Sequence, residues 1–353
     1  MGRPAGGTWS AAVTTLLERA APASPPPADA DVPRQIDPGR APVDKAFRFS
    51  ALGVAALVLI IFGSIGVFLL LKAWPALRHY GWAFFTEADW NPESNKVGVA
   101  SALIGTIEVA LIALIVAFPL ALGTALFISE YAPTPIKGAL VAIIDLMAAV
   151  PSIIYGLWGA SVLQDHAKYI ARWLHQYLGW IPLFKVDTDP NAAVWQQSRY
   201  TTSMFIAGLC VSMMVIPIAC SVMRGVFTAA PLGEREAAFA LGSTRWGMIR
   251  TVVLPFGRGG IVGGTMLGLG RALGETIAVL MILSLDFHIT FHPLQANGAT
   301  ISALIADRFG EATSLQLSGL LAAGLVLFVV TLFVNTLAAA IVSRSRSGAA
   351  TEI

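Results

Sequence analysis

The hydrophobic residues of this chain gather in long stretches that polar loops separate. A helix needs about 20 mostly apolar residues to cross the hydrocarbon core of a bilayer. Six stretches meet this requirement, and they lie at residues 50–71, 98–128, 138–163, 201–223, 259–285 and 317–342. The pattern therefore predicts an all-α polytopic membrane protein with six transmembrane helices.

Composition agrees with this prediction and narrows the chemistry. The 353-residue chain is 56% hydrophobic and only 12% charged, whereas soluble domains carry about 25% charged residues. The formal net charge of +2 gives no case for a nucleic-acid partner, which requires a clustered basic face. Cys210 and Cys220 lie in one apolar stretch without metal-site spacing, so we expect two small buried side chains. We expect neither a metal nor a cofactor.

The distribution of charge predicts an orientation. Six spans place both termini on one side of the membrane. Most of the 23 Lys and Arg residues fall in the two tails and in the loops 129–137 and 224–258, which by the positive-inside tendency face the cytoplasm. Residues 1–46 are rich in Pro and Ala and predict a disordered cytoplasmic tail with one short amphipathic helix at 9–20. Residues 47–345 would form the transmembrane domain.

The external segment 164–200 carries too many charges to cross the membrane. Within it, residues 166–180 place apolar and aromatic side chains at helical spacing, namely Ile170, Trp173, Leu174, Tyr177 and Leu178. Trp and Tyr favour the membrane–water interface. The segment predicts an amphipathic helix that either lies on the lipid surface or docks an extracytoplasmic partner.

The loop at 224–258 has the pattern of a helix, a break and a second helix. Pro231 suits a helix start, and Gly242 suits the left-handed position that follows a helix end. Ser243 or Thr244 can then cap the next helix. Ala237 and Ala238 would give the first helix a smooth surface that another protein can approach closely.

Charged residues occur inside three of the predicted spans, and we expect Asp145 in the third span to have a structural role. Arg271 and Glu275 lie on the same side of the fifth span as Gly260, Gly264 and Gly268, so this bare face could pack closely on another helix or leave room for a solute. A charge inside the bilayer costs at least about 2.5 kcal/mol unless it is paired or hydrated. The two residues could neutralise each other, or Arg271 could bind an anion through its planar fork. Glu108 in the second span is a further candidate for either a gating or a structural role.

The loop motif resembles that of a known family. Glu236-Ala237-Ala238, followed by Gly242 and by an aliphatic-x-Leu-Pro ending at Pro255, is similar to the coupling loop of ABC-importer permeases. The resemblance implies a type I importer-permease fold, and it implies that the short helix inserts into a groove on a separate ATPase subunit. The chain itself lacks the G-x-x-x-x-G-K-[ST] phosphate loop, so we expect a transport permease and not an ATP-hydrolysing enzyme.

Further stretches resemble the phosphate-specific branch of that family. The sequence from Gly268 to Thr276, which includes Arg271-Ala-Leu-Gly-Glu275, looks like the fifth helix of PstC-type permeases more than that of the related PstA type. The resemblance implies three partners: a PstA-like second permease, a dimer of PstB-like ATPase subunits, and a PstS-like extracytoplasmic phosphate-binding protein. It also links Arg271 and Glu275 to phosphate passage.

Two other functions remain open from the residues alone. A permease for sulfate or molybdate would keep the Glu-Ala-Ala loop but is less expected to carry Arg-Ala-Leu-Gly-Glu. A secondary transporter would also bury charges, but it would not need the loop and often contains an inverted repeat. Charge chemistry favours phosphate, because monohydrogen phosphate carries a proton that Glu275 can accept, whereas sulfate at neutral pH does not.

Overall fold

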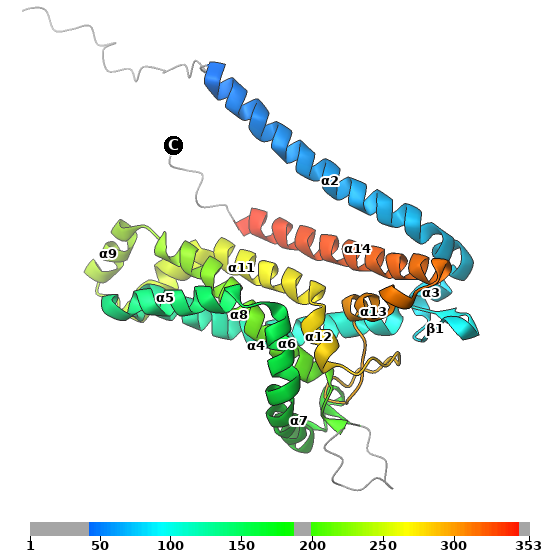
Figure 1. Cartoon of the computed structure of the whole chain (residues 1–353). Coiled ribbons are helices and arrows are strands. Elements are labelled where there is room, and N and C mark those ends of the chain that lie inside the picture. Colours follow the sequence, from blue (N-terminus) through cyan, green and yellow to red (C-terminus); the bar gives the residue numbers. More distant parts are fainter. Residues whose placement is uncertain (1–41, 187–198, 346–353) are drawn as a thin grey trace, which may run out of the picture. The chain divides into compact units, whose positions relative to one another are not determined.

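The computed structural model of the chain describes residues 42–186 and 199–345 (Figure 1). The chain divides into two units, residues 1–60 and 61–353. In the first unit, the described part is the beginning of helix α2 (Pro42–Tyr80), where every side chain from 43 to 60 is exposed. Helix α2 begins at Pro42, a residue suited to a first turn, and so includes the last residues of the predicted tail. The rest of that tail, with the predicted helix at 9–20, lies outside the described residues.

The described residues of the second unit are mostly helical. Among them is one two-residue antiparallel ladder, in which Trp90 of β1 pairs with Val97 of β2. Its α-helices and strands after α2 are α3 (Ala83–Thr86), β1 (Trp90–Asn91), β2 (Lys96–Val97), α4 (Ala100–Leu126), α5 (Thr134–Ala149), α6 (Ser152–Trp158), α7 (Gln164–Leu178), α8 (Met204–Thr228), α9 (Leu232–Ala240), α10 (Arg245–Met248), α11 (Leu254–Gly274), α12 (Ile277–Ile282), α13 (Ile301–Arg308) and α14 (Ser314–Ser345). Three π-helical turns, η3 (Phe127–Tyr131), η4 (Gly159–Leu163) and η7 (Ile249–Val253), connect some of these helices.

The predicted spans correspond to long apolar helices. By length and composition, five described helices can cross a membrane, and a sixth span results if α5 and the helix at 152–178 are counted together. These two helices meet at an angle of 89°. The bend lies at Pro151, because Pro restricts the residue before it to an extended conformation and Val150 is extended.

The centre of the helix bundle depends on small residues. On α4, the side chains of Ala113, Ala117, Ala121 and Ala125 are fully buried at every fourth position, which forms one smooth face. A Cβ atom added to Gly208 of α8 would lie 2.6 Å from the Ile112 side chain, so α4 and α8 pack with their backbones close together. Cys210 and Cys220 of α8 are buried free thiols, as predicted.

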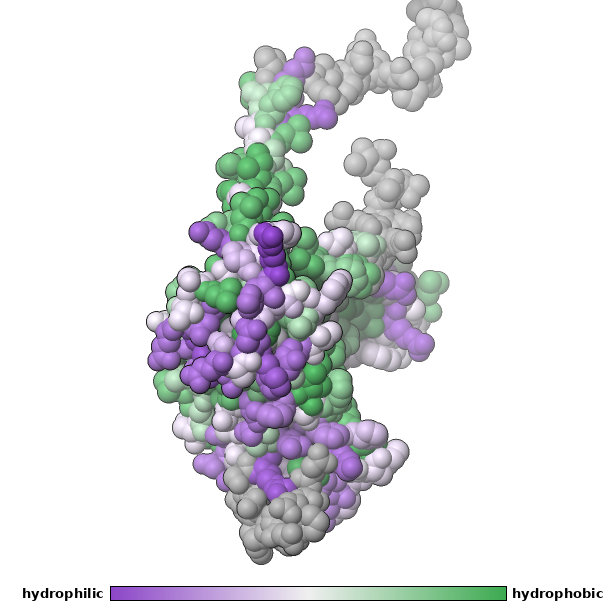
Figure 2. Space-filling model, turned by 90° about the vertical axis from the view of Figure 1, so that its right-hand side faces the viewer, coloured by the Kyte–Doolittle hydropathy of each residue, from purple (hydrophilic) through white to green (hydrophobic). Residues whose placement is uncertain are grey.

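Large apolar side chains cover much of the outer surface of the helices. Exposed Leu, Ile, Val and Phe residues recur along α4, α5, α6 and α14, as expected for helices that face lipid. Figure 2 looks onto the end of the bundle that carries β1 and α13, where hydrophilic residues gather. The opposite end carries α9 and α10 (Figure 1).

Helix α7 confirms the prediction of an amphipathic helix in the external segment. Ala167 and Ala171 are fully buried against the rest of the chain, whereas Trp173 and Tyr177 are more than half exposed. The aromatic side therefore faces outward, where lipid or a partner protein could cover it. Residues 187–198 of the segment lie outside the described part of the chain.

Candidate functional site

The fifth apolar stretch is interrupted at Glu275. The sequence predicts one span over 259–285, and this prediction is wrong in detail, because α11 ends at Gly274 and α12 begins at Ile277. Glu275 has an extended backbone, with φ −68° and ψ 127°. Gly274 at the end of a glycine-rich helix weakens helix propagation, and Arg271 is left in the last turn of α11.

Hydroxyl groups satisfy the backbone at this interruption. The Thr276 hydroxyl donates to the Gly274 carbonyl over 3.1 Å, and the Ser302 hydroxyl of α13 donates to the Glu275 carbonyl over 2.6 Å. Non-helical backbone at membrane depth is tolerated only where protein or water satisfies it. The break is therefore a built feature of the fold, which two side chains support.

The three residues predicted to line a path, Arg271, Glu275 and Glu108, do not form ion pairs with one another. Glu275 is buried, with 8% of its surface exposed, but no ion pair joins it to Arg271 within residues 42–186 and 199–345. The hypothesis of a self-neutralising pair is therefore wrong for this conformation. The Arg271 Nε and the Glu108 Oε2 are buried without a hydrogen-bond partner among the described residues. Such groups are costly unless a ligand, water or another subunit satisfies them.

A second break lies beside the first. The short helices that follow the two breaks, α6 and α12, pack so closely that a Cβ atom on Gly156 would lie 2.8 Å from the Ala278 Cα. The Tyr155 hydroxyl donates across the Pro151 break to the Met147 carbonyl over 2.9 Å. Arg271 lies in the last turn of α11, directly before the first of these breaks.

The glycine face of α11 serves mainly helix packing. Cβ atoms on Gly260, Gly264 and Gly268 would each meet α8 at 2.9 Å or less, so this series has no room for a solute. Gly263 and Gly274 instead have no neighbour within 4 Å. The predicted bare face is therefore divided, and its open positions alone could line a path.

The loop at 224–258 folds as a helix, a break and a second helix, as predicted. After α9, Gly242 takes the left-handed conformation with φ 82°. Its N–H donates to the Phe239 carbonyl, and the Ser243 N–H donates to the Ala238 carbonyl, which is the Schellman arrangement of helix ends. The Thr244 hydroxyl then caps α10 by accepting from the Gly247 N–H over 3.1 Å.

The residues of the Glu-Ala-Ala motif face in two directions. Glu236 and Ala237 are exposed, whereas Ala238 is buried against a core cluster of its own chain that includes Ile249 and Val253. The expectation that both alanines form an outward surface is therefore wrong for Ala238. Its small side chain instead lets α9 pack closely onto the bundle.

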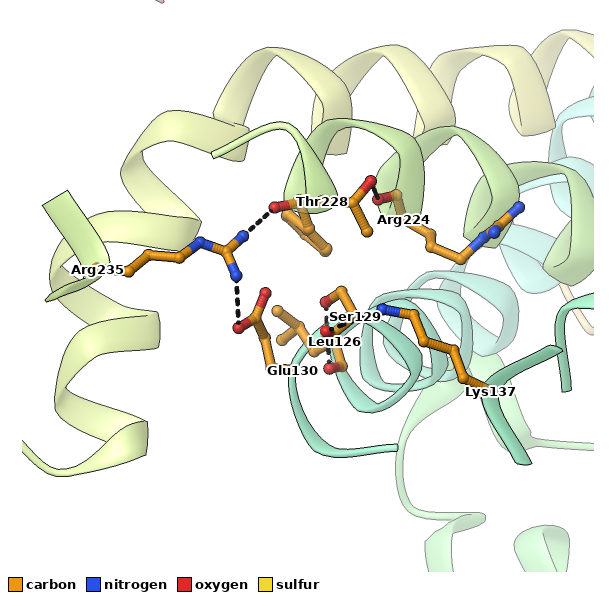
Figure 3. A network of polar contacts seen from close by, with 8 residues as sticks. Leu126, Ser129, Glu130, Lys137, Arg224, Thr228 and Arg235 are labelled. Carbon is orange, nitrogen blue, oxygen red and sulfur yellow. Dashed lines mark hydrogen bonds and ion pairs between the residues drawn. The ribbon is translucent and has the colours of Figure 1, made fainter. Parts of the chain in front are cut away.

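Two further residues bind α9 to the bundle, and the sequence reasoning missed both. The Arg235 guanidinium of α9 forms an ion pair with the Glu130 carboxylate of η3, with 3.1 Å between Nη1 and Oε2 (Figure 3). Its Nη2 donates to the Phe227 carbonyl in the last turn of α8. The sequence offered two signals for this ion pair. Glu130 is a carboxylate directly after an apolar stretch, and Arg235 is a cation directly before the Glu-Ala-Ala motif.

The loop and the helix break are parts of one helical segment. The chain is helical from Arg245 to Gly274, without a break of more than one π turn. This segment leads from the residue after the Thr244 cap to the residue before Glu275. One continuous helical segment therefore connects the end of the loop with Arg271.

Comparison with known proteins gives three results. Residues 117–347 match the family described as "Binding-protein-dependent transport system inner membrane component". The phosphate transport system permease protein PstC of Xylella fastidiosa (strain Temecula1) is 39% identical over 88% of this chain and 94% of its own, and the protein named PstC 2 of Mycobacterium tuberculosis is 38% identical over 86% and 93%. A bacterial ABC transporter involved in alginate import has a similar fold, with a TM-score of 0.51 and 19% identity over 86% of this chain and 98% of that one.

Proposed function

This chain belongs to the family of binding-protein-dependent transport system inner membrane components, and we propose that it is the permease subunit of an ATP-driven importer of inorganic phosphate. As a member of that family, it is a multi-pass inner-membrane permease that works with other transporter components. The proposal that phosphate is the substrate rests on the 39% identity, over 88% of the chain, to a relative named as a phosphate transport permease.

We propose that Arg271, Glu275 and Glu108 line the path of the anion. Arg271 lies in the last turn of α11, and its Nε is buried without a partner in the described residues. A guanidinium presents donors in a fork that matches the oxygens of phosphate. Two observations support this role: Glu275 lies at the neighbouring helix break, and the open surface at Gly274 leaves room for a small solute.

We further propose that Glu275 contributes to the choice of phosphate over sulfate. A buried carboxylate repels an anion unless a proton lies between them. Monohydrogen phosphate can donate such a proton to Glu275, and sulfate at neutral pH cannot. Glu275→Gln removes the acceptor charge while it keeps the size of the side chain. The expected result is weaker discrimination against sulfate, and unchanged discrimination would contradict this role.

The α9 end of the bundle is proposed to receive the movement of the ATPase. The exposed residues Glu236 and Ala237, with the turn at Gly242, would contact that partner, while the buried Ala238 holds α9 against the bundle. Large apolar side chains that water would not favour surround this surface, namely Leu232, Phe239, Leu241 and Trp246. Closure of an ATPase dimer would draw two such loops together and open the spans outward.

The partner set and the orientation follow from the same proposal. The permease would pair with a second, related permease, two ATPase subunits and an extracytoplasmic phosphate-binding protein. Both termini and the α9 end would face the cytoplasm. The aromatic side of α7, at the other face of the membrane, would contact either the lipid surface or the binding protein.

Reconstitution of the complete transporter in liposomes tests this function. ATP hydrolysis that requires the binding protein and increases with phosphate is the expected result. Stimulation by sulfate or molybdate in place of phosphate would assign the permease to another oxyanion. Phosphate uptake without any ATPase subunit would instead indicate a secondary transporter and overturn the proposal. Arg250→Gln changes an exposed residue of the same loop and is the control for the variants of this loop that are described below.

A further inference from the structure

In addition to the apolar packing of Ala238, one polar side chain of helix α9 reaches two other elements of the helix bundle. Arg235 lies in the middle of the nine-residue helix and points away from its exposed side (Figure 3). One arm of its guanidinium pairs with Glu130, and the other donates to the Phe227 carbonyl. Glu130 belongs to the end of the α4 segment, and Phe227 to the end of α8, so one residue joins three helices.

This contact is shielded from water, unlike most ion pairs on protein surfaces. The Glu130 side chain is 4% exposed, and that of Arg235 is 16% exposed. Solvent and salt screen buried pairs much less than exposed ones. The Phe227 carbonyl, in the last turn of α8, already accepts from the Ala230 N–H over 3.2 Å. Arg235 therefore adds a second donor to this carbonyl while it pairs with a buried carboxylate.

The neighbouring contacts strengthen the same junction. Glu130 lies in the π turn η3, and π turns are rare features that often occur at functional sites. Arg245, at the start of α10, lies over the ring of Tyr131 at 5.5 Å from its centroid. Lys137 donates to the Ser129 carbonyl over 3.4 Å (Figure 3). The end of α4 thus contacts the loop on both sides of Gly242.

We infer that Arg235 and Glu130 are positioning residues that lock α9 to the ends of α4 and α8, so that a displacement of α9 moves these two spans as well as α11. Without this lock, a force on α9 would pass along the chain through α10 into α11 and through the apolar packing of Ala238. With it, the force also reaches the ends of α4 and α8 through directional polar contacts. The inference rests on the proposed coupling role of α9.

A variant that removes both charges can distinguish a coupling role of the Arg235–Glu130 pair from a purely structural role. The Glu130 Oε1 and the Arg235 Nε have no further partner among the described residues, so removal of one partner leaves the other charge buried and uncompensated. Single variants can therefore lose folding as well as coupling. The neutral double variant Glu130→Gln with Arg235→Gln removes both charges, which should restore folding without restoring the lock.

The first experiment measures coupling in the reconstituted transporter. Glu130→Gln, Arg235→Gln, the double variant and the control Arg250→Gln are compared by the yield of assembled complex and by stimulation of ATP hydrolysis by the phosphate-loaded binding protein. We expect the double variant to assemble like the wild type but to lose stimulation about tenfold, the factor that one charge-assisted hydrogen bond is worth. Full stimulation in an assembled double variant would overturn the inference.

The second experiment does not depend on the substrate. A nitroxide at Leu241→Cys, on a side chain that is 87% exposed, reports the motion of the segment by electron paramagnetic resonance in the full-length chain. The natural cysteines are buried and should not be labelled. The label should become more mobile in the double variant and remain unchanged with Arg250→Gln. Equal mobility in all variants would refute the lock, whereas an absence of phosphate stimulation in the wild type would refute only the proposed function.

Discussion

The two charged regions of this permease differ in how their charges are satisfied. At the α9 end, the Arg235 guanidinium has the Glu130 carboxylate and a backbone carbonyl as partners. At the break after α11, Arg271 and Glu275 are four residues apart, yet the described part of the chain shows no ion pair between them, because the helix ends at Gly274 and Glu275 is extended. Both Glu130 and Glu275 are buried, so the exposure of the carboxylates does not explain the difference.

This contrast indicates what each region is for. A charge that is paired inside its own chain contributes to a fixed arrangement, because separating the pair leaves a buried charge behind. A buried charge without a partner must find one in a ligand, in water or in another subunit. This contrast supports the proposal that the α9 end transmits force and that the break contacts the transported anion.

The largest effect should come from removing the unpaired cation. Arg271→Gln deletes the proposed donors to phosphate, and the loss of two charge-assisted hydrogen bonds corresponds to a decrease of roughly 100-fold. Uptake of radiolabelled phosphate into proteoliposomes measures this change. Arg271→Lys keeps the charge but loses the planar fork, so its uptake should be intermediate. Wild-type uptake with Arg271→Gln would remove Arg271 from the path.

The turn at Gly242 should show a smaller loss. Its φ of 82° is unfavourable for residues with a side chain, although no atom lies within 4 Å of an added Cβ. The left-handed conformation costs a side chain about 1–2 kcal/mol, and Asn tolerates it better than most residues do. Gly242→Val should therefore lower binding-protein-stimulated ATP hydrolysis about tenfold, and Gly242→Asn should lower it much less. Equal activities would show that the conformation of this turn is not needed for coupling.

The close packing of α11 on α8 predicts that a substitution at their contact changes the stability of the permease. A Cβ atom at Gly264 would lie 2.9 Å from the Ala219 carbonyl oxygen of α8, whereas Gly263 has open space. Gly264→Ala should therefore destabilise the permease by about 1–3 kcal/mol. Gly263→Ala should be neutral or stabilise it by up to about 1 kcal/mol through helix propensity. Melting temperatures of the two variants in detergent distinguish these outcomes, and similar values would show that α11 and α8 are not closely packed there.

Features that depend on local sequence were predictable in both regions of the molecule. The bend at Pro151, the left-handed Gly242 and the cap at Thr244 each depend on the residue itself and its immediate neighbours, and all three occur. The six apolar spans were predictable for the same reason, since the length of a hydrophobic stretch is a local property.

The features that the sequence did not predict depend on distant partners. The helix break at Glu275 needs the Ser302 hydroxyl, 27 residues further along the chain, to satisfy its carbonyl. Arg235 and Glu130 are 105 residues apart, and neither is unusual in its own segment. Hydrophobic periodicity shows which side of a helix is buried, but it does not show which charge on that side meets a partner.

An exposed pair on the opposite side of the bundle provides the smallest effect and tests whether burial matters. His288 and Asp286 form a contact of 2.6 Å in the loop between α12 and α13, with the His288 side chain 80% exposed. The hydrogen bond to Asp286 raises the pKa of His288 above its ordinary value of 6.5. The pair therefore stabilises the folded chain fully below that ordinary pKa, and its contribution disappears as the pH rises through the raised pKa. Because solvent screens exposed pairs, we expect this pair to contribute less than about 1 kcal/mol to the free energy of unfolding.

The melting temperatures of the wild type and of Asp286→Asn should differ more at about pH 5.5 than at about pH 8. A difference that does not depend on pH would contradict the pairing, and one as large as that caused by Arg235→Gln would show that burial does not separate the two kinds of ion pair.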